Sequence, residues 1–183
     1  ETKPAEPKGE ACVYENQKIM EPKAKYIDHE NGAFFSEKPE YMTQIYGNRL
    51  VNKNDPMIKF RGKLDKVQAE VVFAQTMISS GNSSEALLND LNDVLATLRE
   101  MMRCEVMNEP FANDTIIGLN HEELRAQSHN PMKYHNIKQM LLPDYSMGTA
   151  YSLINLIRTS VRETELLAVD AFMDNKKCVR TDI

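Results

Sequence analysis

The sequence predicts an all-α protein, a four- or five-helix bundle with an extended N-terminal arm. Three long segments carry apolar residues at helical spacing, over residues 57–78, 82–108 and 149–173. Stripes this wide are most simply buried in a helical bundle. Because only three long helices are visible, we expect the bundle to be completed by the N-terminal piece or by a further helix beyond Ile183.

Each helical segment has its own start signal or apolar face. The segment 57–78 follows Asp55 and Pro56, a common helix start. Capping boxes pair Asn82 with Glu85 and Asn120 with Glu123, and the second of them predicts a short helix. The predicted core positions of the first segment are Phe60, Leu64, Val67, Val71, Ala74 and Ile78. Those of the second are Leu87, Leu88, Leu91, Val94, Leu95, Leu98, Met101, Met102 and Val106.

The last segment, residues 149–173, has two different faces. Its predicted core face consists of Leu153, Leu156, Ile157, Ser160, Val161, Thr164, Leu167, Ala168 and Ala171. Arg158, Arg162 and Glu165 line up on the opposite side. On the pattern alone this stripe is most simply a solvated face with weak ion pairs. The sharper interpretation is an anion site, because two arginine forks one turn apart suit a polyphosphate.

Composition sets the broad class. The 183 residues, 42% hydrophobic, are enough for one bundle domain at 39–183. Residues 1–38 are rich in proline and short polar runs, which indicates an extended arm or a small strand pair. A net charge of −5 argues against nucleic acid, and no apolar run approaches the length of a membrane span. Three distant cysteines indicate neither disulfides nor a zinc site, so a reduced, cytoplasmic protein is expected.

A long connector separates the second and last long segments. A connector of about forty residues in a compact domain is usually functional. It contains His129 and His135, which without a third ligand are more simply surface histidines than metal ligands.

Two blocks of the chain resemble the ethanolamine-utilisation cobalamin adenosyltransferases. The first contains KPEYMT at 38–43, GNRLV at 47–51, Lys53, Pro56 and FRGKLD at 60–65. The second contains SHNPMKY at 128–134, LPD at 142–144 and NLIRTSVRETE at 155–165. Their order and spacing agree with the family over residues 38–183, and each block alone would be a weak signal.

The resemblance implies an enzyme that transfers the 5′-deoxyadenosyl group of ATP to cob(I)alamin. Its product would be adenosylcobalamin for ethanolamine ammonia-lyase, with Mg²⁺ held through ATP. A distant similarity to the propanediol-utilisation type implies a homo-oligomer, with a trimer favoured and ATP between subunits. The implied location is the cytoplasm or a bacterial microcompartment. Two alternatives stay open, a corrinoid-binding protein without transferase activity and a helical scaffold whose arginine stripe is an oligomer interface.

The resemblance also implies site residues. Arg162 and Glu165 match ATP-binding positions and are the predicted catalytic pair. Arg158 matches an arginine that reaches across a subunit interface to an aspartate, here Asp65. The predicted cofactor-binding residues are Lys38, Thr43, Lys53, Arg61, Asp65, Tyr134, Met140 and Arg158. Because Co(I) itself attacks the ribose, no side-chain nucleophile is needed, and cations such as Arg162, Lys53 and Lys38 are expected at the leaving polyphosphate. Spacing leaves two interpretations for Arg61 and Lys63, a substrate contact or the solvent side of the first helix.

Two features of the wider family have a different form here. The bulky aromatic that excludes a lower axial ligand from cobalt falls at Met140, with Tyr134 nearby, and ordinary loop packing is the alternative role for both. The metal-binding cysteine cluster upstream of Lys38 is replaced by a segment with His29 and no cysteine, so we expect no protein-bound metal. The family's last helix, with its Asn-Arg-Leu-Ser-like motif, is expected to be missing from this chain.

Overall fold

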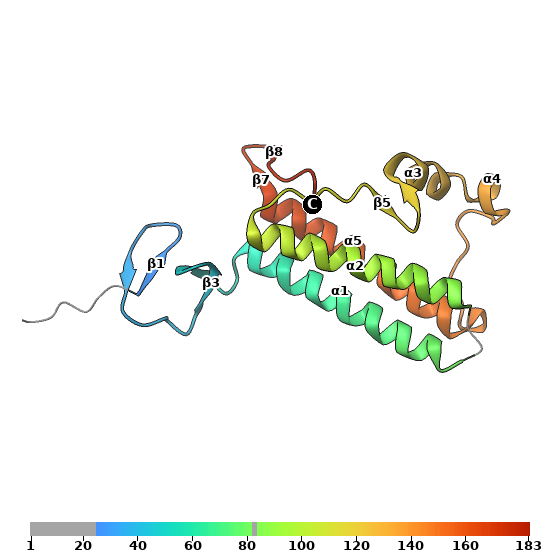
Figure 1. The fold of residues 1–183 in the computed structure, drawn as a ribbon, viewed down its shortest axis with the longest axis horizontal. Coiled ribbons are helices and arrows are strands. Elements are labelled where there is room, and N and C mark those ends of the chain that lie inside the picture. Colours follow the sequence, from blue (N-terminus) through green and yellow to red (C-terminus); the bar gives the residue numbers. More distant parts are fainter. Residues whose placement is uncertain (1–24, 82–83) are drawn as a thin grey trace, which may run out of the picture.

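Three long helices form the body of the protein. The computed structural model describes residues 25–81 and 84–183. Helices α1 (Pro56–Ser79), α2 (Glu85–Met107) and α5 (Gly148–Phe172) run side by side (Figure 1). Helix α1 packs against both of the others. The three predicted long helices are therefore confirmed, and within the described residues they make a three-helix bundle, while α3 (His121–His129) and α4 (Pro131–His135) are short and contain no buried residue.

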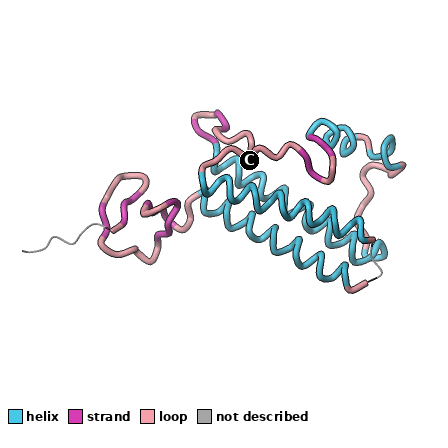
Figure 2. The backbone as a smooth tube through the Cα atoms, viewed as in Figure 1, coloured by secondary structure: helices cyan, strands magenta, loops and turns pink. Residues whose placement is uncertain are grey.

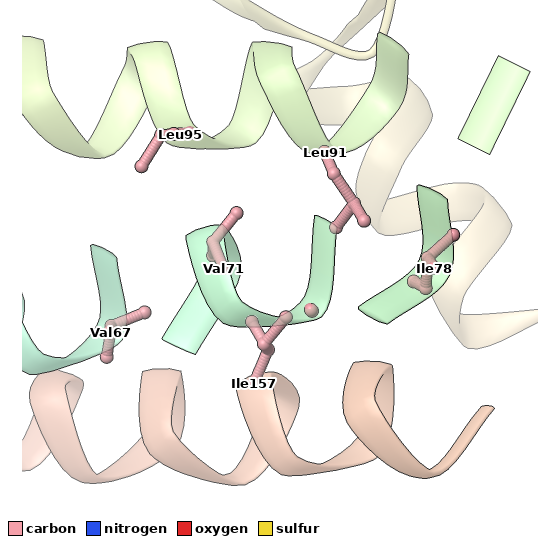
Figure 3. Close-up of a cluster of buried hydrophobic side chains, with 7 residues drawn as sticks. Val67, Val71, Ile78, Leu91, Leu95 and Ile157 are labelled. Atoms are coloured by element: carbon pink, nitrogen blue, oxygen red, sulfur yellow. The ribbon is translucent and has the colours of Figure 1, made fainter. Parts of the chain in front are cut away.

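The core has two parts. Toward one end, α1 contributes Val67, Val71 and Ile78, which meet Leu91 and Leu95 of α2 and Ile157 of α5 (Figure 3). Toward the other end, the rings of Phe60 and Phe172 meet edge to face with centroids 5.2 Å apart. All six core positions predicted for α1 are its buried residues. The apolar period of a single helix was enough to identify them.

The predicted faces of α2 and α5 need correction. Val106 on α2 is exposed, as are Leu156 and Val161 on α5. Glu105, a charged residue, is buried instead. Helices α2 and α5 each have a narrower buried face than their apolar stripes predict. Within the described residues, each of them packs mainly against α1, on one side only.

Helix ends follow local hydrogen-bonding signals. The Asp55 carboxylate accepts a hydrogen bond of 2.8 Å from the Met57 amide, with Pro56 in the first turn, as predicted. The predicted box at Asn120 and Glu123 is present, with both reciprocal hydrogen bonds formed. Helix α2 begins after Ser84. The predicted cap, Asn82, lies outside the described residues.

The N-terminal half also contains a four-stranded sheet, which corrects the all-α class. Its strands are β1 (Tyr26–Asp28), β2 (Phe34–Phe35), β3 (Met42–Tyr46) and β4 (Arg49–Asn52), in the order β2-β1-β4-β3. Strand β1 is antiparallel to β2 and parallel to β4, and β3 and β4 form a hairpin. Strands β1 and β2 pair with each other before residue 38, and the expected boundary at that residue falls between strands of one sheet. Figure 2 shows these strands beyond the end of the bundle.

The remaining described residues form small elements. Strands β5 (Thr115–Ile116) and β6 (Leu119–Asn120) lead into α3, and a 3-10 helix at Tyr145–Met147 leads into α5. After α5, β7 (Met173–Asp174) and β8 (Lys177–Cys178) form a second hairpin. None of the helices described is both long and apolar enough to traverse a bilayer.

Candidate functional site

The arginine stripe of α5 lies on the solvent side, as its spacing predicts. Arg158, Arg162 and Glu165 are exposed. The Arg158 Nε donates a hydrogen bond of 3.1 Å to the Asn155 side chain. Neither Arg162 nor Glu165 has a hydrogen-bond or ion-pair partner within the described part of the chain. Their charged groups are therefore open to a ligand.

Glu165 also borders an apolar groove. A cavity of about 110 Å³ is lined by residues of all three long helices, α1, α2 and α5. It is lined by Phe60, Leu64, Val67, Leu98, Met101, Val161, Thr164, Glu165, Ala168 and Ile183. The predicted catalytic glutamate thus stands at the rim of a mostly hydrophobic hollow.

Two charged residues of the first helix, Lys63 and Asp65, differ in their burial and in their partners. Lys63 forms an ion pair with Glu163 of α5, and this hydrogen bond holds the pKa of the Glu163 carboxyl below its usual value. Asp65 is exposed and is not paired with Arg158 within this chain. The predicted contact between Asp65 and Arg158 across subunits stays a prediction. The Lys63 side chain is only 13% exposed, which disfavours the second of its two interpretations, a position on the solvent side of the first helix.

The Arg61 side chain is only 15% exposed, which likewise disfavours a position on the solvent side of α1. Its guanidinium donates two hydrogen bonds to Glu105 of α2, at 2.6 and 3.0 Å. A third, of 2.8 Å, goes to the backbone carbonyl of Ile45 on β3. Glu105 was missed by the analysis of the sequence, although it lies four residues after Met101 and seven after Leu98, on the same helical face. A carboxylate at such a position requires a cation from another element.

The predicted nucleotide residues near the sheet are accessible. Lys38 is exposed, and Thr43 of β3 is half-buried opposite Val51 of β4. Lys53 follows β4, and its Nζ lies 3.0 Å from the Glu40 carboxylate, which holds the pKa of Glu40 below its usual value. Both partners of this pair are well exposed, so it is weak and exchangeable. Lys53 also lines an open hollow of about 500 Å³.

The connector carries its apolar side chains on the outside. Met140 is 92% exposed and has a positive φ of 59°, so the ordinary-packing interpretation of this residue is wrong. Leu142 is 82% exposed and Tyr145 is 91% exposed. Between residues 131 and 147, the exposed large hydrophobic residues are Met132, Tyr134, Ile137, Met140, Leu141, Leu142 and Tyr145. We call these seven residues the connector patch.

The histidines are not gathered into a metal site in the part of the chain that the structure describes. His129 Nδ1 lies 2.8 Å from the Arg125 carbonyl, and the ring of His29 contacts that of Tyr46 edge to face. Across residues 25–81 and 84–183, no three His, Cys, Asp or Glu side chains come close enough to hold a metal ion.

The predicted residues fall into separate groups. The sheet group, Lys38, Thr43 and Lys53, lies beyond the start of α1, and the connector patch lies near the other end of the bundle (Figure 1). Helix α1 has 24 residues, and a helix of this length spans about 36 Å. The arginine stripe occupies α5 between them. One chain therefore does not bring all of the predicted residues into a single pocket.

The described chain is a bundle of long helices with an arginine and a glutamate exposed one turn apart on one face of α5. Residues 34–183 match the cobalamin adenosyltransferase family, and the chain belongs to it. The corrinoid adenosyltransferase EutT of Salmonella typhimurium is 36% identical over 148 residues, covering 80% of this chain and 53% of that protein. EutT of Escherichia coli is 34% identical over 149 residues, covering 81% of this chain and 54% of that protein.

The chain thus spans about half the length of the curated relatives that it matches. No solved structure gives a significant match.

Proposed function

We propose that this protein transfers the 5′-deoxyadenosyl group of ATP to cob(I)alamin, as part of ethanolamine utilisation. Family membership and the names of the two relatives support this activity. The observation on which the proposal depends is that Arg162 and Glu165 stand exposed on α5 with no partner among the described residues. Charged groups that are free in the unliganded chain are suited to hold a nucleotide.

The reaction needs charge stabilisation rather than a protein nucleophile. The Co(I) of the corrinoid substrate forms a bond to the 5′-carbon of the ribose, and the bond from that carbon to the phosphate oxygen breaks. The electron pair of the broken bond leaves with the polyphosphate, which gains negative charge in the transition state. Arg162 supplies a rigid fork of donors for those oxygens, and we assign to Glu165, three residues further along α5, the role of orienting that fork once the nucleotide is bound.

Lys53 is the second cation that we assign to the polyphosphate. With it we assign Lys38, whose charge also acts on Glu40, and Thr43 on β3. The weak pair between Lys53 and Glu40 can open when phosphate oxygens arrive, because both groups are already hydrated. Magnesium enters bound to ATP, in keeping with its preference for phosphate oxygens and water.

The connector patch is assigned to the corrinoid. A corrin ring has a broad apolar face, and the patch exposes Met140, Leu142 and Tyr145 almost completely. Burial of these side chains against the ring would exclude water and a lower axial ligand from cobalt. The patch alone would equally suit a corrinoid-binding protein without transfer activity, so formation of the product has to separate the two functions.

A homo-oligomer, with a trimer favoured, would bring the separate groups together. Asp65 and Arg158 are both exposed and are not paired with each other within one chain, which leaves both available to a second copy. We place the activity in the cytoplasm or in a bacterial microcompartment.

The direct experiment mixes the protein with MgATP and chemically reduced cob(I)alamin and follows the absorbance of adenosylcobalamin. The proposal predicts a product that requires both MgATP and protein. Binding of cobalamin without product would favour the corrinoid-binding function. Binding of neither ligand by an intact oligomer would favour a helical scaffold.

A further inference from the structure

The most deeply buried charged pair of the described chain joins two helices. The Glu105 side chain on α2 is only 3% exposed, and Arg61 on α1 is 15% exposed. The Arg61 Nε and one terminal nitrogen donate to the two carboxylate oxygens of Glu105, at 2.6 and 3.0 Å. A buried carboxylate is unfavourable unless such donors satisfy it, so the pair has a fixed geometry.

The same guanidinium reaches a third element. Its other terminal nitrogen donates a hydrogen bond of 2.8 Å to the carbonyl of Ile45 on β3. The β3–β4 register shifts at this point, with Gln44 opposite Leu50 and Tyr46 opposite Arg49. This bulge leaves Ile45 without an opposite residue, and Arg61 satisfies its carbonyl from outside the sheet.

We propose that Arg61 and Glu105 are positioning residues that hold the β3–β4 hairpin on the helical bundle. The hairpin carries Thr43 and leads directly into Lys53, so its placement sets where these residues meet ATP. This inference rests on the proposed function and deepens it. Glu105 acts through Arg61, and Arg61 acts through the backbone of Ile45, so neither residue needs to touch the nucleotide.

A direct nucleotide contact by Arg61 makes the opposite prediction. Neutralising Glu105 would then free the guanidinium for phosphate oxygens, and MgATP would bind equally well or more tightly. If Arg61 instead positions the hairpin, the same change weakens its hydrogen bond to the Ile45 carbonyl, and MgATP binds less tightly. The direction of the change in affinity therefore separates the two roles.

The test compares Glu105→Gln with Glu100→Gln, a matched change on the same helix in an exposed pair with Arg103. Hydrogen exchange of the amides at residues 42–52 and the Kd for MgATP are measured on the full chain. For Glu105→Gln we expect exchange in the hairpin to accelerate and the Kd to rise, each about tenfold, since a hydrogen bond to a charged group is worth at least that factor. In Glu105→Gln, exchange of the amides in the core of α5 should stay as in the wild type. In Glu100→Gln, both the exchange of the hairpin amides and the Kd for MgATP should stay as in the wild type.

A second variant tests the same proposal in case Glu105→Gln does not fold. Arg61→Lys keeps the positive charge but lacks the fork, and we expect the same two changes. Unchanged exchange in the hairpin would overturn the proposal, and so would faster exchange with an unchanged or lower Kd. If the wild-type protein does not bind MgATP, the proposed function fails, and the positioning role fails with it.

Discussion

Replacing Arg162 with alanine should remove activity while leaving stability almost untouched. Arg162 is exposed in the middle of α5 and has no partner in the described part of the chain, so its truncation breaks no internal contact. Alanine and arginine are both good helix formers. The free energy of unfolding should therefore change by less than about 0.5 kcal/mol, as for other surface substitutions.

The expected loss of activity follows from the contacts that one guanidinium can make. One or two charge-assisted hydrogen bonds to phosphate oxygens, at about 1.5–3 kcal/mol each, give roughly 2–4 kcal/mol of transition-state stabilisation. This corresponds to a fall in kcat/KM of about 30- to 10³-fold.

The assay follows adenosylcobalamin formation at saturating reductant, with thermal unfolding of each variant measured in parallel. Arg99→Ala is the matched control, because Arg99 is an exposed arginine of α2 that likewise has no partner in the described chain. A loss of activity below about threefold would refute the assignment of Arg162, since it is less than one hydrogen bond of this kind supplies. An equal loss in Arg99→Ala, or a large fall in Tm for Arg162→Ala, would refute it as well.

Three further predictions concern the core, the C-terminal segment and the connector. Phe60→Ala should lower the free energy of unfolding by about 3–5 kcal/mol, because it empties a fully buried site, and urea unfolding measures this. Arg180 holds the pKa of Asp182 well below its usual range, so the folded state favours the carboxylate and the pair stabilises the fold above about pH 4. The stability difference between the wild type and Asp182→Asn should therefore be constant near neutral pH and shrink as the pH falls below about 4; a difference that grows in acid would contradict this. Leu142→Asp should raise the Kd for cob(II)alamin about tenfold or more, since burying an unpaired carboxylate against an apolar ring is costly, with no change for MgATP; equal weakening of both ligands would argue against the connector patch as the corrinoid surface.

The helices of this protein were predictable because their signals are local. The stripe in α1, from Phe60 to Ile78, needs only the period of one helix, and the cap at Asn120 needs four consecutive residues. The sheet was only partly predicted. Strand β1 pairs in parallel with β4, which lies more than twenty residues further along the chain, and two- to five-residue strands carry little periodicity of their own.

The candidate site also has features that local spacing predicts and features that depend on residues distant in the sequence. Helical spacing placed Arg162 and Glu165 on an exposed face of α5, and the structure agrees with this placement. The pairing of Arg61 with Glu105 joins residues 44 positions apart, and nothing local in the sequence identifies such a partner. The exposure of Met140 could not be predicted from the sequence either, because a methionine in a loop commonly packs against its neighbours.

The most direct test of the central claim is the absorbance spectrum of cob(II)alamin with this protein, recorded with and without MgATP. Adenosyl transfer predicts a shift toward the spectrum of Co(II) without a lower axial ligand when MgATP is present, followed by adenosylcobalamin when a reductant is added. A spectrum that does not respond to MgATP, with no product after reduction, would contradict the claim.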